Sequence, residues 1–141
     1  MTVIVVESKL RLDIVTPHGR IFSGDVDEIT ATGSEGEFGI LPGHAPFMTM
    51  LKTGMLTCKK SGDMTYFFVG GGYAEAGPDK VTILADSAEK AEDIDVERAC
   101  AAMKRAEERL EQAEDYDFGR ATASLARAAI RVQVAEKRTV K

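Results

Sequence analysis

Glycine and proline are confined almost entirely to the first part of this chain. Twelve of the thirteen glycines lie at or before Gly77, and all four prolines lie at or before Pro78. The residues that follow are rich in alanine and charged side chains and are interrupted only by Gly119. Because glycine and proline mark turns whereas Ala, Glu and Arg favour helix, the sequence predicts a turn-rich β part joined to a helical tail.

Short segments of alternating polarity predict strands in the first part. Apolar and polar residues alternate from Leu10 to Val15, which is the period of a half-buried strand. Further strand candidates, all short and bounded by turn residues, are 21–22, 26–32, 38–41, 47–51, 55–58, 65–69 and 81–84. Strands of this length and spacing predict an all-antiparallel sandwich or flattened barrel.

Apolar residues at spacings of three and four predict two helices in the tail. The first seam consists of Val96, Ala99, Met103, Ala106, Leu110 and Ala113. The second consists of Phe118, Ala121, Leu125, Ala128, Val132 and Ala135, with Asp117 as the predicted N-cap. A short turn between two such helices predicts an antiparallel hairpin.

Alanine fills half of these seam positions. Since a core Leu-to-Ala change costs about 2 to 5 kcal/mol, the interface between the helices should be weaker than a leucine seam of equal length. Alanine also has the highest helix propensity, so the helices can separate without melting if another surface is available. The seam therefore suits either a conformational switch or a static hairpin in which alanine permits close approach.

The charge and cysteine content exclude several classes of protein. A net charge of −5 argues against nucleic acid as the main partner. Residues 118–141 nevertheless carry +5 and the rest −10, so the tail is expected to meet an acidic surface of this chain or of a partner. Cys58 and Cys100 lack the spacing of a zinc site and read as free thiols in a reducing compartment. No apolar run approaches the roughly 20 residues of a membrane span, and the chain is expected to be cytoplasmic.

The segment 33–46 has the densest turn chemistry in the chain. It is not a P-loop, because no lysine followed by Ser or Thr comes after its last glycine. Acid–base chemistry by Glu35, Glu37 and His44 would make a small hydrolase, but nothing nearby supplies a nucleophile, and an exposed loop is favoured. Three glycines at 70–72 indicate a bulge or a close strand crossing rather than a ligand loop.

Several of these motifs together resemble a known family. They are the runs 12–17, 22–24, 33–37, 43–46, 71–73 and 82–86, which read LDIVTP, FSG, GSEGE, GHAP, GGY and TILAD. In this order they closely resemble the epsilon subunit of bacterial F-type ATP synthase, from about Leu10 to the end of the chain. The chain differs in Met1 to Lys9, which extend past the family's usual start.

The resemblance implies a fold that agrees with the reading of the residues. The family combines a flattened ten-stranded β-sandwich with a two-helix hairpin. We therefore expect a mostly β plus α protein, with an N-terminal flattened antiparallel β-sandwich over residues 1–88 and a C-terminal antiparallel two-helix hairpin over residues 89–141.

The resemblance also implies a function without catalysis. Epsilon is a rotor subunit on the central stalk of the proton-translocating F-type ATP synthase, where it binds the gamma subunit and the polar loops of the membrane c-ring. Its hairpin moves between a folded form and an extended form, which meets the catalytic beta and alpha subunits and inhibits ATP hydrolysis. The implied location is the cytoplasmic face of the bacterial inner membrane, peripheral and without direct membrane insertion.

Two sets of candidate residues follow from the family's motifs. Ser34, Glu35, Gly36 and His44 match the segments at the ring-facing end, and an acidic residue suits a basic polar loop. The other reading of His44 is a histidine whose polar atoms are satisfied locally beside two prolines.

The second set resembles the ATP-binding motif of bacterial epsilon subunits. Its members are Glu89, Ile94, Asp95, Arg98, Ala99, Arg105, Arg127 and Arg131. Arginines bind phosphate oxygens in bidentate fashion, while Glu89 and Asp95 can accept hydrogen bonds from the adenine amino group or orient the arginines. No cofactor is required, and ATP would be a regulatory ligand that favours the folded hairpin.

Plainer readings of the same residues remain open. Asp95 is a good N-cap with or without nucleotide, and Arg98 and Arg105 can be solvated, with Glu108 as a surface partner of Arg105. Arg127 and Arg131 have no acidic residue three or four positions away, so they are expected to meet an external anion, either nucleotide phosphates or an acidic segment of a catalytic subunit. The alternative function from another class is a free-standing nucleotide-sensing module.

Overall fold

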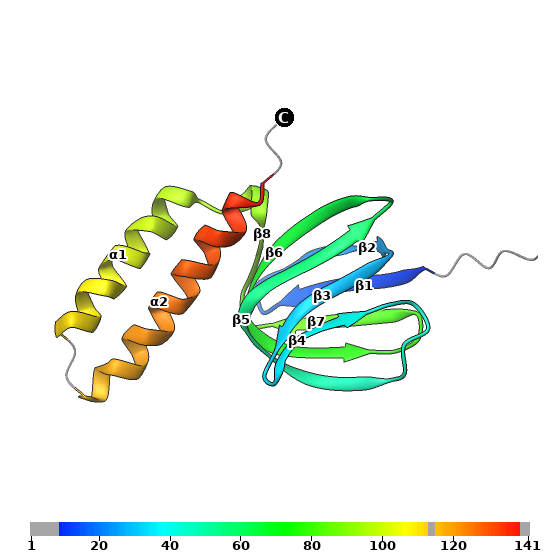
Figure 1. The fold of residues 1–141 in the computed structure, drawn as a ribbon, viewed down its shortest axis with the longest axis horizontal. Coiled ribbons are helices and arrows are strands. Elements are labelled where there is room, and N and C mark those ends of the chain that lie inside the picture. The colour runs from blue at the N-terminus through cyan, green and yellow to red at the C-terminus, as the bar shows by residue number, and fades with distance from the viewer. Residues whose placement is uncertain (1–8, 113–114, 139–141) are drawn as a thin grey trace, which may run out of the picture.

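A strand-rich region precedes a pair of helices in the computed structural model, which describes residues 9–112 and 115–138 (Figure 1). The strands are β1 (Leu10–Thr16), β2 (Gly19–Val26), β3 (Glu28–Gly33), β4 (Gly36–Ile40), β5 (Phe47–Lys60), β6 (Asp63–Ala76), β7 (Lys80–Ala85) and β8 (Ala88–Lys90). A 3₁₀ turn, η1 (Ala91–Asp93), leads to the helices α1 (Val96–Gln112) and α2 (Asp115–Glu136). Of the N-terminal extension at Met1 to Lys9, only Lys9 lies within the described residues.

The strands form one continuous hydrogen-bonded path in the order β2-β1-β7-β6-β5-β3-β4, with β8 paired to β6. This path folds on itself into the predicted sandwich (Figure 1). The expectation of an all-antiparallel arrangement is wrong at one place, because β1 and β7 pair in parallel, with Leu12 opposite Val81 and Ile14 opposite Ile83. Alternation of polarity reports which face of a strand is buried and carries no information on strand direction.

Two long strands replace three of the short segments expected from the sequence, namely 47–51, 55–58 and 65–69. β5 and β6 each contain 14 residues and pair with each other along their length. The described residues therefore form eight strands and not the ten of the family fold. β6 passes through the three glycines at 70–72, where the predicted close strand crossing is confirmed: a Cβ on Gly72 would lie 2.0 Å from the Leu84 carbonyl oxygen.

Two apolar clusters hold the chain together. The larger fills the sandwich, and its inward side chains alternate along β1, as predicted from Leu10 to Val15. The smaller lies between the sheet and the helices and contains Phe68, Val134 and Ala135. Phe67 and Phe68 are both fully buried but belong to different clusters, because neighbouring residues of a strand point to opposite faces.

Alanine lines the contact between the two helices, as the sequence predicts. Ala106, Ala121 and Ala128 are all buried. The helix boundary and one seam position differ from the expectation: α2 begins at Asp115, before the predicted cap at Asp117, and Phe118 is 55% exposed. Phe118 lies less than one turn from the tip of the hairpin, where α1 offers no long surface to cover it. Ala113 lies outside the described residues.

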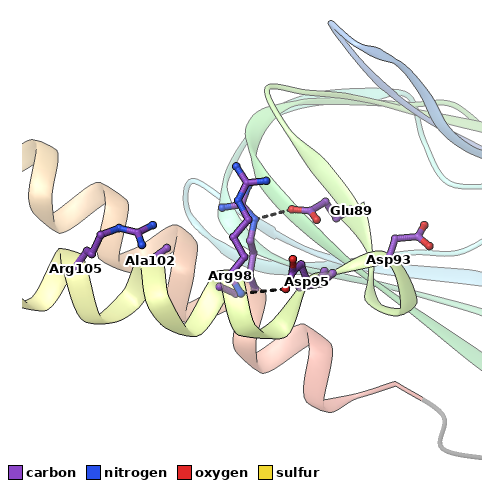
Figure 2. A pocket seen from close by; sticks show the side chains of 9 residues that line it. Glu89, Asp93, Asp95, Arg98, Ala102 and Arg105 are labelled. Atoms are coloured by element: carbon purple, nitrogen blue, oxygen red, sulfur yellow. Dashed lines mark hydrogen bonds and ion pairs between the residues drawn. The ribbon is translucent and has the colours of Figure 1, made fainter.

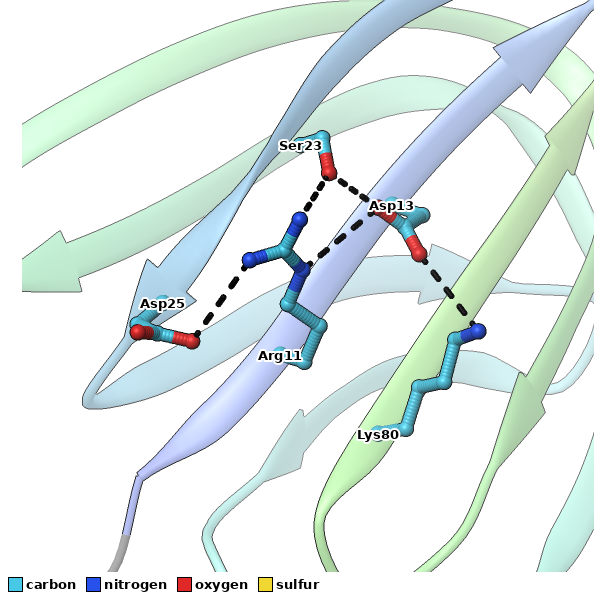
Figure 3. A network of polar contacts seen from close by, with 5 residues as sticks. All are labelled: Arg11, Asp13, Ser23, Asp25 and Lys80. Carbon is cyan, nitrogen blue, oxygen red and sulfur yellow. Dashed lines mark hydrogen bonds and ion pairs between the residues drawn. The ribbon is translucent and has the colours of Figure 1, made fainter.

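A polar network joins β1 to both of its neighbours (Figure 3). The Ser23 hydroxyl donates to Asp13 Oδ1 at 2.5 Å and accepts a hydrogen bond from the Arg11 guanidinium at 2.6 Å. Lys80 Nζ of β7 lies 3.6 Å from Asp13 Oδ2. The hydrogen bond from Ser23, with Lys80 and Arg11 nearby, holds the pKa of Asp13 below its usual value against the opposing effect of burial.

Neither cysteine is in a disulfide. Cys58 is buried in β5, where burial raises the pKa of its thiol, and Cys100 is exposed on α1. In the part of the chain that the structure describes, no helix has the length and apolar character needed to cross a membrane.

The crossing at Gly72 predicts a large effect of a small substitution. Gly72 has a φ of 130°, and Gly19 has a similar φ of 127° but nothing within 4 Å of its Cβ position. We expect Gly19→Ala to cost about 1–3 kcal/mol for its backbone conformation alone, and Gly72→Ala to cost clearly more because its methyl group meets the β7 backbone. Urea unfolding of both variants measures the difference. Equal losses would contradict a steric role for the crossing.

The Asp13 network predicts a pH-dependent contribution to stability. Because the folded-state pKa lies below the ordinary value of about 3.9, the contribution is present at neutral pH and is lost as the pH falls through the folded-state value. Asp13→Asn should lower the free energy of unfolding by about 1–2 kcal/mol at pH 7. The difference from the unmodified chain should shrink at pH 3, as measured by urea unfolding.

Asp25→Asn is the matched control, since Asp25 lies 4.0 Å from Arg11 and its side chain is 47% exposed. A loss for Asp13→Asn that stays constant between pH 7 and pH 3, or one no larger than that of Asp25→Asn, would contradict this account.

Candidate functional site

The first turn of α1 forms one wall of the candidate ligand site. Asp95 Oδ1 accepts a hydrogen bond from the Arg98 amide at 3.0 Å, and the Asp95 carbonyl accepts one from the Ala99 amide at 2.9 Å. Asp95 is therefore the N-cap of α1, which confirms the plainer reading of this residue. The cap fixes where the helix begins and thus where Arg98 projects.

A cavity of about 480 Å³ lies where β8, η1, α1 and α2 meet (Figure 2). Its volume falls within the range of small-molecule sites. Its lining residues are Glu89, Asp93, Ile94, Asp95, Arg98, Ala99, Ala102, Arg105 and Arg131. Seven of the eight residues that resemble an ATP-binding motif are thus brought together around one space.

The eighth residue, Arg127, lies in a neighbouring cavity of about 210 Å³ between the two helices. This second cavity shares Ala102, Arg105 and Arg131 with the first. Sequence reasoning missed four other lining residues, namely Asp93, Ala102, Arg109 and Ser124. Arg109 follows Arg105 by four positions, so helical spacing places both on one face. This spacing could have identified Arg109 from the sequence.

Charges are unevenly distributed along the cavity. Glu89, Asp93 and Asp95 gather at the end near β8 and η1, and Arg105 lies farther along α1 (Figure 2). Carboxylates accept hydrogen bonds from amino groups, whereas arginines bind anions. The arrangement suits a ligand with a hydrogen-bond donor at one end and a polyanion at the other.

Arg131 already has an acidic partner within the chain, although its spacing in the sequence predicts none. Its Nε donates to Glu89 Oε1 at 2.7 Å, and its Cζ lies 4.2 Å from the centroid of the Phe68 ring. Intrahelical spacing could not indicate this pair, because Glu89 is 42 positions away in the sequence. The contact agrees with the expectation that the basic tail meets an acidic group of this chain or of a partner. Arg127 has a partner close in the sequence, since it donates a hydrogen bond to the Ser124 hydroxyl three positions earlier at 3.2 Å.

The candidate ring-contact residues lie on two separate loops. Ser34 and Glu35 form the exposed turn between β3 and β4, and the φ of 125° at Gly36 closes this turn. His44 lies beyond the other end of β4, where its Nδ1 is 2.7 Å from the Ala45 carbonyl oxygen and its ring centroid is 4.9 Å from that of Phe47. These local contacts match the alternative interpretation of His44, a histidine whose polar atoms are satisfied by neighbouring residues.

The hydrolase alternative finds no support in these loops. Among the described residues, His44 makes no hydrogen bond or ion pair with Glu35 or Glu37, and both carboxylates are exposed. The same described part of the chain contains no group of three or more His, Cys, Asp or Glu suited to a metal ion. The three residues thus do not form a constellation for acid–base chemistry.

An uncovered apolar row crosses four strands of the sandwich. Met50 on β5 is opposite Tyr73 on β6, Tyr73 is opposite Leu84 on β7, and Leu84 is opposite Val15 on β1. Met50, Tyr73 and Leu84 are 56%, 50% and 50% exposed. We call Met50, Tyr73, Leu84 and Val15 the apolar row. It was not predicted from the sequence, although apolar residues on both faces of the strand at 47–51 indicate that one of those faces is an uncovered apolar surface.

The loop at Ser34 borders the apolar row. The Ser34 amide donates to the Met50 carbonyl at 3.0 Å. Met48, two positions before Met50 on β5, is 67% exposed and lies on the same face. One face of the sandwich therefore combines an apolar surface with an acidic turn at its edge.

A β-sandwich extended by a two-helix arm is the architecture of a described family. Residues 9–91 match the model for the ATP synthase delta/epsilon chain, β-sandwich domain, and residues 92–136 match the model for its long α-helix domain. Relatives named ATP synthase epsilon chain include one from Thermodesulfovibrio yellowstonii, which is 53% identical over 104 residues, with 74% of each chain covered. Another, from Geobacter sulfurreducens, is 57% identical over 102 residues, covering 72% of this chain and 74% of the relative.

Solved structures show the same fold. A chain of the Euglena gracilis mitochondrial ATP synthase is 22% identical, with a TM-score of 0.79 over 94% of this chain and 84% of that chain. A chain of the Tetrahymena thermophila mitochondrial ATP synthase, in a structure of its central stalk and c-ring, is 16% identical, with a TM-score of 0.57 over 90% of this chain and 96% of that chain. The chain belongs to the ATP synthase delta/epsilon chain family, and within it to the epsilon chains of bacterial F-type ATP synthases.

Proposed function

We propose that this chain is a non-catalytic rotor subunit that couples rotation of the membrane c-ring to the catalytic head of the ATP synthase. The observation that carries this proposal is the apolar row. An exposed apolar surface of this kind favours a protein partner, because contact removes the row from water. The gamma subunit is the proposed partner on this face, in a peripheral position at the cytoplasmic side of the inner membrane.

The turn at Ser34, Glu35 and Gly36 is the proposed contact with the polar loops of the ring. Its carboxylate is exposed and lies at the edge of the face that bears the apolar row. A solvated acidic group at the rim of an interface contributes mainly to orientation and association rate. His44, in the loop after β4, is the second proposed contact, and its half-buried ring against Phe47 leaves part of the imidazole accessible.

We further propose that the helical hairpin regulates ATP hydrolysis and senses ATP. The two adjoining cavities support this proposal because they collect five arginines from both helices, with three carboxylates at the end near β8 and η1. A nucleotide whose amino group meets Glu89 or Asp95 and whose phosphates meet Arg98, Arg105, Arg127 and Arg131 would bridge α1 and α2. ATP would thus favour the folded hairpin over an extended form that contacts the catalytic beta and alpha subunits.

The alternative function is a free-standing nucleotide-sensing module. It would use the same arginines of the hairpin. It would leave the apolar row without a partner, which is unfavourable for a monomer in water. Binding to gamma therefore separates the two functions.

The docking proposal predicts a loss of gamma binding when charge is placed in the apolar row. Met50→Glu should weaken capture of purified gamma subunit by at least about tenfold, because a carboxylate would be buried unpaired at the interface. Met64→Glu is the matched control. Met64 is also an exposed methionine, 41% accessible, and it lies at the opposite end of the β5–β6 hairpin from Met50. Equal capture of both variants, or no capture of the unmodified chain, would contradict the proposal.

The nucleotide proposal predicts saturable ATP binding to the full chain. Arg98→Ala and Arg127→Ala should each weaken it about tenfold or more, because each removes charged hydrogen bonds to phosphate. Calorimetric titration with ATP and with ADP measures the effect, and Arg120→Ala, an exposed arginine of α2 that lines neither cavity, is the control. Absence of binding at millimolar ATP would overturn the nucleotide proposal and leave the docking proposal unaffected.

A further inference from the structure

The hairpin meets the sandwich mainly through the last third of α2. This helix contacts β5, β6 and η1. The buried residues at the junction are Phe68, Ala91, Ile94, Ala99, Val134 and Ala135. Three of the six are alanines, and the larger apolar side chains packed around them are only partly buried, namely Met55, Tyr66, Val96, Ile130 and Val132.

Arg131 adds a polar contact at the same junction. Its Nε lies 2.7 Å from Glu89 Oε1, and its guanidinium carbon lies 4.2 Å from the centroid of the Phe68 ring. Phe68 and Glu89 are directly opposite each other on β6 and β8, so the sheet presents both to one arginine. Within residues 9–112 and 118–138, whose side chains the structure describes, this is the one ion pair between the hairpin and the sheet.

The contact is protected from solvent on one side. Phe68 is fully buried, and the side chains of Arg131 and Glu89 are 28% and 35% exposed. A guanidinium over an aromatic face is attracted by the ring quadrupole, more strongly when it is partly desolvated. The planar group can stack on Phe68 and donate to Glu89 together, which a lysine ammonium cannot reproduce.

We infer that Arg131, Phe68 and Glu89 form a latch that keeps the hairpin on the sandwich when no ligand is bound. The contact uses Nε and the face of the guanidinium, and the terminal amino groups make no hydrogen bond to any described residue. Arg131 also lines both cavities. An anion at the terminal amino groups therefore adds to the latch and does not compete with Glu89.

The latch does not depend on the proposed nucleotide function, because it consists of contacts within the chain. Hydrogen exchange of the full chain without nucleotide tests it. Arg131→Lys and Phe68→Leu should each accelerate exchange of the peptides from residues 124–136 by about fivefold or more. The double variant should exceed the larger single effect only slightly, since both changes remove the same contact.

Arg120→Lys is the matched control, because it makes the same chemical change at an exposed position of α2 that is remote from Phe68. Peptides from β1 and β7 report whether the sandwich remains folded in each variant. If Phe68→Leu disturbs the sheet, Glu89→Gln is used as the second variant in its place. Its acceleration of exchange in residues 124–136 should be larger at low salt than at high salt, because salt screens the ion pair that it removes. Exchange of Arg131→Lys equal to that of Arg120→Lys, or single effects that multiply in the double variant, would overturn the latch.

Discussion

Burial of β6 on both faces joins the two parts of this protein. Phe67 points into the sandwich, where its ring lies 5.3 Å from that of Phe22, and Phe68 points out to the helices. Because neighbouring side chains of a strand alternate between faces, the same backbone that orders the sandwich also presents the surface on which α2 packs. The cavity depends on this arrangement, since Glu89 is held opposite Phe68 by pairing of β8 with β6.

The long β5–β6 hairpin separates the apolar row from the helical hairpin, the two regions for which we propose functions. The apolar row lies at the open end of the β5–β6 hairpin, where Met50 near the start of β5 is opposite Tyr73 near the end of β6. The helical hairpin packs near Phe68, in the first half of β6. A paired two-strand segment of 14 residues on each side connects them. The proposed docking surface and the proposed regulatory hairpin therefore belong to one small chain without sharing residues.

Much of the local structure and of the candidate ligand site could be predicted from the sequence. The alternation from Leu10 to Val15, the alanine seam and the Asp95 cap depend on residues within a few positions of one another. The family motif named seven residues that surround one cavity. Arg109 was not predicted, because apolar periodicity identifies the buried seam of a helix and does not show which charged residues beside it line a cavity.

Sequence by itself determined which part of the chain forms strands and which forms helices, the buried face of β1 and the residue that caps α1, because these features follow from backbone periodicity and nearby side chains. Only the tertiary structure decided that β1 pairs in parallel with β7 and that Arg131 meets Glu89 and Phe68. It also aligned Met50, Tyr73 and Leu84 across three strands into one exposed row. These contacts join residues far apart in the chain, and they depend on strand order and register, which no single segment encodes.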